Sequence, residues 1–172
     1  MTMFKILGCI MIFAGSTCIG LLKSASYKSR RTELENTIEL LRMLQMDITY
    51  RKDSLQKTFV KTADLKECWF SDLLISCSDL LALHMTIEEA WRTSIERSMA
   101  MCPLCCDDLE VLKDVAMGLG KSDTTGQSSV FEPALLRLTS ALHEASEQEK
   151  KQGRMYRSLG ISAGLVIVIL FL

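Results

Sequence analysis

Two uncharged apolar stretches lie near the ends of the chain, and amphipathic segments fill the length between them. Residues 6–22 and 159–172, which are 17 and 14 residues long, contain no charged side chain. As helices, they approach or fall just short of the roughly 30 Å hydrocarbon core of a bilayer. We therefore expect one transmembrane helix in residues 1–22 and another in residues 158–172.

Between these stretches, apolar side chains recur at the three- and four-residue steps of a helix. The longest such stripe runs from Arg30 to Tyr50 and consists of Leu34, Ile38, Leu41, Leu44 and Ile48. Because this spacing places them on one face, it predicts an amphipathic helix that continues from the first apolar stretch almost without a break.

Three further stripes predict shorter helices. Asp53 or Ser54 can cap a helix that carries Leu55, Phe59 and Val60. The next stripe consists of Phe70, Leu73, Leu74, Cys77, Leu80 and Leu81. Thr86 and Glu89 have the spacing of a capping box, and the helix that they open carries Ala90, Trp91, Ile95 and Met99.

The last two predicted helices depend on proline and glycine signals. Pro103 suits the first turn of one helix, and Gly118 or Gly120 can end it. Its apolar face carries Leu104, Leu109, Leu112 and Ala116. Ser122 and Asp123 can cap the final helix, which runs on into the second apolar stretch and carries Leu135, Leu138, Leu142 and Ala145. Because Gly126 and Pro133 interrupt it, we expect a kink near residues 129–133.

The predicted fold class is all-α, because strand-like alternation persists nowhere and proline occurs only twice. We expect a bundle of about six helices anchored by N- and C-terminal transmembrane helices. The domains are then residues 1–22, residues 23–157 and residues 158–172, of which the middle one is an acidic helical domain with basic ends.

Charge separates sharply along the chain, although the formal net charge is only −1. Residues 32–149 hold 11 basic and all 21 acidic residues, a net of −10. The two flanks of this region hold eight basic residues and are expected to lie at the membrane surface. They are Lys23, Lys28, Arg30, Arg31, Lys150, Lys151, Arg154 and Arg157. Since basic residues stay on the cytoplasmic side, we expect a two-span protein with a cytoplasmic central domain and both termini on the opposite side.

The N-terminus also allows a different interpretation, a cleaved signal peptide. Lys5 would supply the basic region, residues 6–13 the apolar region, and residues 14–16 a small-residue cleavage site. The basic residues from Lys23 to Arg31 directly after this segment argue against export of the domain that follows.

An acidic domain repels nucleic acid and anionic membrane surfaces and attracts basic partners. Seven carboxylates are expected to be exposed on two successive helices and to form a partner-docking surface. They are Glu88, Glu89, Glu96, Asp107, Asp108, Glu110 and Asp114. The plainer alternative is that this charge only keeps a helical bundle soluble.

Small residues recur at four-residue spacing in both apolar stretches, at Ser16 and Gly20 and again at Gly160 and Gly164. Small side chains let membrane helices approach closely, so these four residues are expected to pack the two spans together. The same strip could instead pair two copies of the chain.

The sequence offers few groups for catalysis. There are two histidines, no Gly-rich loop follows a strand, and the seven cysteines form no disulfide framework. We therefore expect no cofactor and no catalytic or metal-binding residue. The alternative is a membrane-tethered thiol redox or metal-binding protein that uses Cys102 and Cys105, since a C-x-x-C at a helix start can hold a thiolate.

The chain resembles the stage III sporulation protein AB family of endospore-forming bacteria over essentially its whole length. The resemblance rests on four segments in order, Lys5-Ile6-Leu7-Gly8, the Leu34 to Tyr50 helix, Leu119-Gly120-x2-Asp123-x3-Gln127, and Ser158-Leu159-Gly160-x3-Gly164-Leu165. That family is similar to the F-type platform proteins of type II secretion. The resemblance implies a non-enzymatic membrane platform in the mother-cell to forespore channel. It also implies a secretion-type ATPase and other channel subunits as partners, with membrane lipid around the spans.

Overall fold

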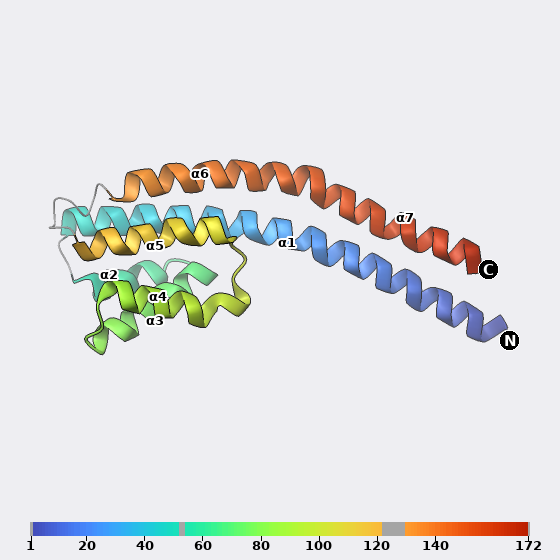
Figure 1. The fold of residues 1–172 in the computed structure, drawn as a ribbon, viewed down its shortest axis with the longest axis horizontal. Helices are drawn as coiled ribbons and strands as arrows, with labels where there is room; N and C mark the ends of the chain where they lie inside the picture. The colour runs from blue at the N-terminus through green and yellow to red at the C-terminus, as the bar shows by residue number, and fades with distance from the viewer. Residues whose placement is uncertain (1, 52–53, 122–129, 172) are drawn as a thin grey trace. The chain divides into compact units, whose positions relative to one another are not determined.

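The structure is a computed structural model that describes residues 2–51, 54–121 and 130–171 (Figure 1). It describes the backbone but not the side chains of residues 2–7, 9, 10, 12, 13, 51, 121 and 167–171. The chain forms two compact units, Met1–Arg31 with Glu144–Leu172, and Thr32–His143. We call them the helix pair and the helical body.

Every regular element in the described ranges is helical, which confirms the all-α prediction. The elements are α1 (Thr2–Arg51), α2 (Leu55–Ala63), α3 (Trp69–Ala82), α4 (Ile87–Ser98), the 3-10 turn η1 (Met99–Met101), α5 (Cys106–Lys121), α6 (Phe131–Gln148), the π-helical segment η3 (Glu149–Gly153) and α7 (Arg154–Phe171). Because α6, η3 and α7 follow one another without a break, they form one continuous helix, and the described ranges then contain six helices, in line with the six expected.

The membrane spans are not supported by the described helices. None of the helices, over the residues that the structure describes, is long and apolar enough to cross a membrane. The expected spans, residues 1–22 and 158–172, fall in part on residues that lie outside this description.

Most side chains of the stripes that the sequence predicts lie in the core of the helical body, although Val60 and Met99 are exposed. Leu34, Ile38, Leu41, Leu44 and Ile48 of α1 are all buried. Burying such side chains contributes about 1.5–3 kcal/mol each before the entropy of ordering is subtracted. The predicted helix from residue 30 to residue 50 is therefore confirmed, and it is continuous with the N-terminal stretch inside α1.

An aromatic cluster joins α2, α3 and α4. The ring of Trp91 packs edge-on against Phe59 and Phe70, with centroid distances of 5.7 and 6.1 Å. All three side chains are almost completely inaccessible to solvent. Edge-to-face packing adds about 0.5–1.5 kcal/mol per pair beyond burial, so this cluster fixes the three short helices to one another.

The cap of α4 lies at the predicted residue, but the Glu89 side chain bonds the Thr86 hydroxyl and not the Thr86 backbone N–H as in a capping box. The Oγ1 atom of Thr86 accepts a hydrogen bond from the Glu89 backbone N–H at 3.3 Å, and the Glu89 side chain bonds the same hydroxyl at 3.0 Å. This satisfies one of the backbone donors that a helix start leaves unpaired. At α2, by contrast, Ser54 is the N-cap without a side-chain bond, and Asp53 lies outside the described residues.

Several expectations about proline and glycine are wrong. Pro103 precedes α5, which begins at Cys106, and α5 runs through Gly118 and Gly120 as far as Lys121. Tertiary packing overrides the glycine signal here, because Val115 and Leu119 are buried.

The kink expected near residues 129–133 is also wrong for residues 130–133, the part of this range that the structure describes. Pro133 is the third residue of α6, and a first-turn proline has no intrahelical N–H bond to lose. The irregularity lies at η3 instead. The other signals used for this helix start, at Ser122, Asp123 and Gly126, lie outside the described residues.

Candidate functional site

Three surfaces carry the residues to which the sequence assigns a function, two on the helix pair and one on the helical body. The first is a seam between α1 and α7. The Ser16 hydroxyl donates a hydrogen bond to the Gly160 carbonyl oxygen at 3.1 Å. A Cβ atom added to Gly20 would lie 2.7 Å from the Tyr156 carbonyl oxygen and 3.1 Å from the Gly160 Cα atom. Only a residue without a side chain fits at this approach.

The structure thus brings together three of the four residues expected to pack the two spans. Gly164, the fourth, is buried. On the other side of the contact, a Cβ atom on Gly160 would lie 3.0 Å from the Ser16 carbonyl oxygen. We call Ser16, Gly20, Gly160 and Gly164 the small-residue seam.

Beyond the seam, the two helices stay paired in antiparallel register (Figure 1). A Cβ atom on Gly153 would meet the Ser24 Oγ atom at 3.3 Å. The rings of Tyr27 and Tyr156 stack with a centroid distance of 6.1 Å and an interplanar angle of 19°. The pairing therefore extends without interruption from the small-residue seam into the basic segments.

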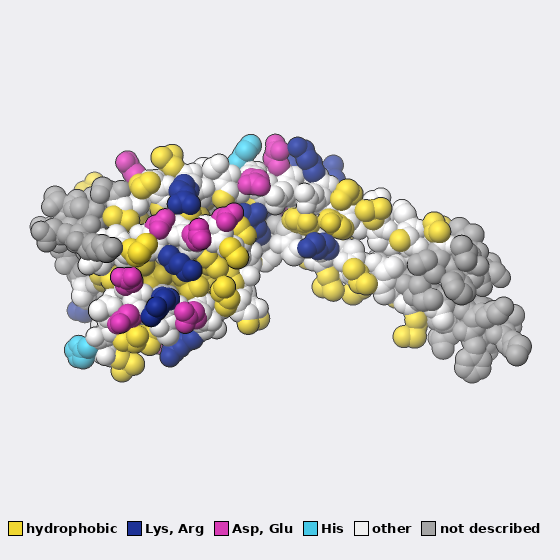
Figure 2. Space-filling view, in the orientation of Figure 1, with side chains coloured by type: hydrophobic (Ala, Val, Ile, Leu, Met, Phe, Trp, Pro, Cys, Tyr) yellow, Lys and Arg dark blue, Asp and Glu magenta, His cyan; other side chains and the backbone are white. Residues whose placement is uncertain are grey.

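The second surface consists of the eight basic residues that were expected to lie at the membrane surface, Lys23, Lys28, Arg30, Arg31, Lys150, Lys151, Arg154 and Arg157. We call them the basic band. All of them lie within the helix pair, and Figure 2 shows dark-blue side chains gathered where α6 passes into α7.

The structure divides the basic band into two groups. Arg30 and Arg31 are half-buried, and they bond Gln148 at 3.3 Å and Glu149 at 3.2 Å across the pair. Lys151 pairs with Glu147 at 3.0 Å on its own helix. The remaining five residues, Lys23, Lys28, Lys150, Arg154 and Arg157, are exposed and have no ion pair among the described residues.

The third surface is formed by α4 and α5 of the helical body. Six of the seven carboxylates expected to dock a partner are exposed, and we call them the acidic surface. They are Glu88, Glu89, Glu96, Asp107, Glu110 and Asp114. Asp114 is partly neutralised by Arg137, whose Nη1 atom lies 3.1 Å from the carboxylate.

Asp108 does not belong to this surface, and its predicted exposure is wrong. Its side chain is buried, and one carboxylate oxygen accepts a hydrogen bond from the Cys105 backbone N–H at 3.0 Å. Asp108 is the third residue of α5, a position from which a carboxylate can reach back to cap the helix start. Its role is therefore local and structural.

An apolar groove of about 400 Å³ crosses the acidic surface between α4 and α5. Its apolar lining comes from Trp91, Ile95, Met99, Ala116 and Met117. Four charged residues also line it, namely Glu88, Arg92, Glu96 and Lys113. Figure 2 shows carboxylates and cations interleaved over this face, with apolar side chains between them.

Sequence reasoning missed the groove because it assigned Met99 to the core. Met99 is instead 54% exposed, and Met117 is 37% exposed. The groove depends on how two helices meet, which periodicity within one helix does not show. The one available signal was the four-residue spacing of Glu88, Arg92 and Glu96, which places them along one face of α4.

The cysteine cluster does not form the thiolate site that the alternative function requires. Cys102 and Cys105 precede α5 and are half-buried, and Cys106 is the first residue of that helix. Burial raises the pKa of the Cys102 thiol, and burial also raises the pKa of Cys77 to about 12. Within the described residues, His, Cys, Asp and Glu side chains nowhere gather in threes as metal ligands would. The hypothesis of a reactive thiol at Cys102 is therefore not favoured.

A buried carboxylate that the sequence did not single out caps α3. Glu33 of α1 is only 6% exposed, and its Oε1 atom accepts a hydrogen bond from the Phe70 backbone N–H at 2.9 Å. The N-cap residue of α3, Cys68, makes no capping bond of its own. Burial raises the pKa of Glu33, although bonds from the backbone N–H groups of Phe70 and Trp69 oppose that effect.

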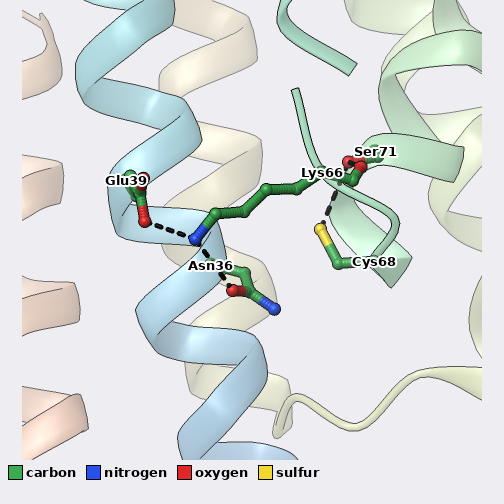
Figure 3. A network of polar contacts seen from close by, with 5 residues as sticks. All are labelled: Asn36, Glu39, Lys66, Cys68 and Ser71. Atoms are coloured by element: carbon green, nitrogen blue, oxygen red, sulfur yellow. Dashed lines mark hydrogen bonds and ion pairs between the residues drawn. The ribbon is translucent and has the colours of Figure 1, made fainter. Parts of the chain in front are cut away.

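Polar contacts around the loop before α3 hold it against α1 (Figure 3). The Lys66 ammonium forms an ion pair with Glu39 and a 3.3 Å hydrogen bond to Asn36, both on α1. The Cys68 Sγ atom lies 3.2 Å from the Ser71 Oγ atom, and burial raises the pKa of this thiol too. These contacts position a helix start and carry no catalytic arrangement.

Comparison with known proteins gives this geometry a context. The family described as stage III sporulation protein AB matches residues 5–172. Stage III sporulation protein AB of Bacillus subtilis (strain 168) is 26% identical over 171 residues, which cover 99% of this chain and 100% of that protein. A solved structure of a stage III sporulation protein AB shares the fold, with a TM-score of 0.67, 22% identity, and coverage of 72% of this chain and 98% of that one. The resemblance seen in the sequence is confirmed, and the chain belongs to the stage III sporulation protein AB family.

Proposed function

We propose that this protein is a non-enzymatic platform of the mother-cell to forespore channel, needed for endospore formation. Membership of the stage III sporulation protein AB family supports a role in sporulation. The platform role comes from the similarity of that family to the platform proteins of secretion systems. The described surfaces suit assembly, because they offer a groove, charged faces and a tightly packed helix pair.

The platform is held in the membrane by residues 1–22 and 158–172, with the central domain in the mother-cell cytoplasm. Two features support this proposal. The first is the absence of charge from residues 6–22 and 159–172. The second is the small-residue seam, since close approach through small residues is what favours contact between helices in lipid.

The central domain docks a cytoplasmic secretion-type ATPase through the acidic surface and the α4–α5 groove. The observation that carries this proposal is the open apolar groove, whose rim holds the carboxylates Glu88 and Glu96 together with Arg92 and Lys113. Exposed methionines adapt to the shape of a partner, and the surrounding charges speed the encounter with a basic one. The alternative of a thiol redox or metal protein is not favoured, because burial opposes thiolate formation at Cys102.

The test measures binding of the purified full-length chain to the secretion-type ATPase of the same sporulating organism. Reversing Glu88 and Glu110 to Lys should weaken binding mainly by slowing association, and the loss should shrink as salt rises. Met117→Asp should weaken binding at all salt concentrations, because it places a charge in the groove.

The control reverses two exposed carboxylates outside the acidic surface, Asp64 and Asp79, to Lys. This control changes the net charge equally and should bind normally. Unchanged affinity of the Glu88 and Glu110 variant at low salt, with helicity intact, would remove the α4–α5 surface from consideration.

A further inference from the structure

We propose that the basic band is a binding site for the headgroups of anionic phospholipids, built from its five cations that have no ion pair. This inference rests on the proposed membrane anchoring and adds a lipid class to it. The cations concerned are Lys23, Lys28, Lys150, Arg154 and Arg157, all of which are exposed.

The residues of the basic band differ in whether an acidic or amide side chain of the helix pair bonds them. Within the helix pair, Arg30 donates a hydrogen bond to Gln148, and Arg31 forms an ion pair with Glu149. The five other cations face solvent without such a partner in the described part of the chain. Residues 23–31 and 150–157 also contain no acidic side chain, so these like charges repel one another until an anion lies between them.

Position and aromatic content identify the anion as a lipid headgroup. The five cations border the two uncharged stretches, with Lys23 and Lys28 after the first and Lys150, Arg154 and Arg157 before the second. Contacts between the two helices place both groups at the same level of the antiparallel pair. Tyr27 and Tyr156 stack on each other at this level, and the Lys23 ammonium lies 5.7 Å from the centroid of the Tyr27 ring. Tyrosines are enriched at membrane interfaces, where one end of the ring is wet and the other is apolar.

The irregular backbone of η3 lies within the same band. Glu149–Gly153 is π-helical, and it contains Lys150 and Lys151. A single π-helical turn inside an α-helix often marks a functional site. Here Gly153, buried against Ser24, lets the two helices stay in contact through the irregular turn.

The experiment uses the full-length chain in a neutral detergent, offered equal amounts of phosphatidylglycerol and phosphatidylcholine with matched acyl chains. Native mass spectrometry measures which lipid stays bound. We expect phosphatidylglycerol to be retained in preference. The triple variant Lys28→Gln, Arg154→Gln, Arg157→Gln should show a weaker preference for phosphatidylglycerol. The preference should fall about fivefold for each cation removed, or roughly a hundredfold in total.

A matched control removes three exposed cations of the helical body by Arg42→Gln, Lys57→Gln and Arg97→Gln. It should retain the wild-type preference. Equal retention of both lipids by the wild-type chain, or an equal loss in the control, would overturn the proposed site. Tighter binding of a 20-base-pair DNA duplex than of phosphatidylglycerol vesicles would also overturn it, in favour of a nucleic-acid surface.

Flotation with vesicles of pure phosphatidylcholine separates this proposal from the anchoring beneath it. Flotation that resists alkaline extraction supports the spans whatever the lipid preference, so a missing preference then overturns the headgroup site alone. Failure to float with either phosphatidylcholine or phosphatidylglycerol vesicles would overturn both the anchoring and the headgroup site.

Discussion

Replacing Glu33 tests how a carboxylate of α1 holds the start of α3. Glu33→Ala removes the acceptor of the Phe70 N–H bond and leaves a buried backbone donor unpaired. Losing such an acceptor costs about 1–3 kcal/mol, and loss of a helix cap costs about 0.5–2 kcal/mol. We therefore expect roughly 2 kcal/mol of destabilisation. For a unit of this size, that lowers the melting temperature by about 8 °C.

Glu33→Gln is the informative partner of that variant, because an amide oxygen can still accept the bond. It removes the cost of holding a charge in a buried place. We expect the Gln variant to be at least as stable as the wild type at neutral pH. Circular dichroism of the full-length chain in neutral detergent, followed during thermal unfolding, measures both variants.

The pH dependence follows from the raised pKa of Glu33. The folded chain then binds a proton at Glu33 more tightly than the unfolded chain does. As the pH falls from above the raised pKa toward the ordinary value near 4.5, the wild type should therefore gain stability relative to the Gln variant. Outside that window, the difference between the two should be constant.

The opposite trend would refute this reasoning. If the wild type loses stability relative to Glu33→Gln as the pH falls, the N–H bonds from Phe70 and Trp69 outweigh burial, and the carboxylate acts as a charged cap. A wild-type melting temperature in Glu33→Ala would show that the buried bond to Phe70 contributes nothing.

Two further predictions concern the helix pair and the cysteines. Gly20→Val should force α1 and α7 apart, because its Cβ atom would lie 2.7 Å from the Tyr156 carbonyl oxygen; overpacking of this kind costs about 1–3 kcal/mol. Short bismaleimide cross-linking between cysteines introduced at positions 30 and 148 should fall accordingly. Cys102→Ser together with Cys105→Ser should leave sporulation efficiency and zinc content unchanged, since burial raises the pKa of Cys102 and opposes a thiolate.

Each of these predictions has a matched control. Gly15→Val should leave the cross-linking unchanged, because nothing lies within 4 Å of a Cβ atom at that position. Equal cross-linking in the Gly20 and Gly15 variants would mean that the small-residue seam does not hold the pair. A sporulation defect in the double serine variant, without loss of helicity, would restore the redox or metal hypothesis.

Periodicity predicted the parts of this fold that depend on one helix at a time. The stripe from Leu34 to Ile48 is buried as expected, and Thr86 caps α4 at the predicted residue. In these cases, local hydrogen bonding and one-sided burial suffice to determine the structure. The small-residue spacing also indicated which residues of the helix pair would come into contact.

The misses arise where tertiary contacts decide what a side chain does. Asp108 looked like a surface charge, but its position at the start of α5 turns it toward the Cys105 N–H. Glu33 looked like one acid among many, and only the approach of α3 gives it a role. Met99 follows the helical stripe of Trp91 and Ile95, yet it lines an open groove because α5 leaves it uncovered.

The central claim is that the α4–α5 groove of this sporulation protein docks a secretion-type ATPase. Site-specific photo-cross-linking in sporulating mother cells tests it most directly, with a photoreactive residue placed at Met117 in the groove and, as the reference, at Asp79 outside it. We expect a cross-link to the ATPase from position 117 and none from position 79. Equal cross-linking from both positions, or an ATPase cross-link from position 79 alone, would contradict it.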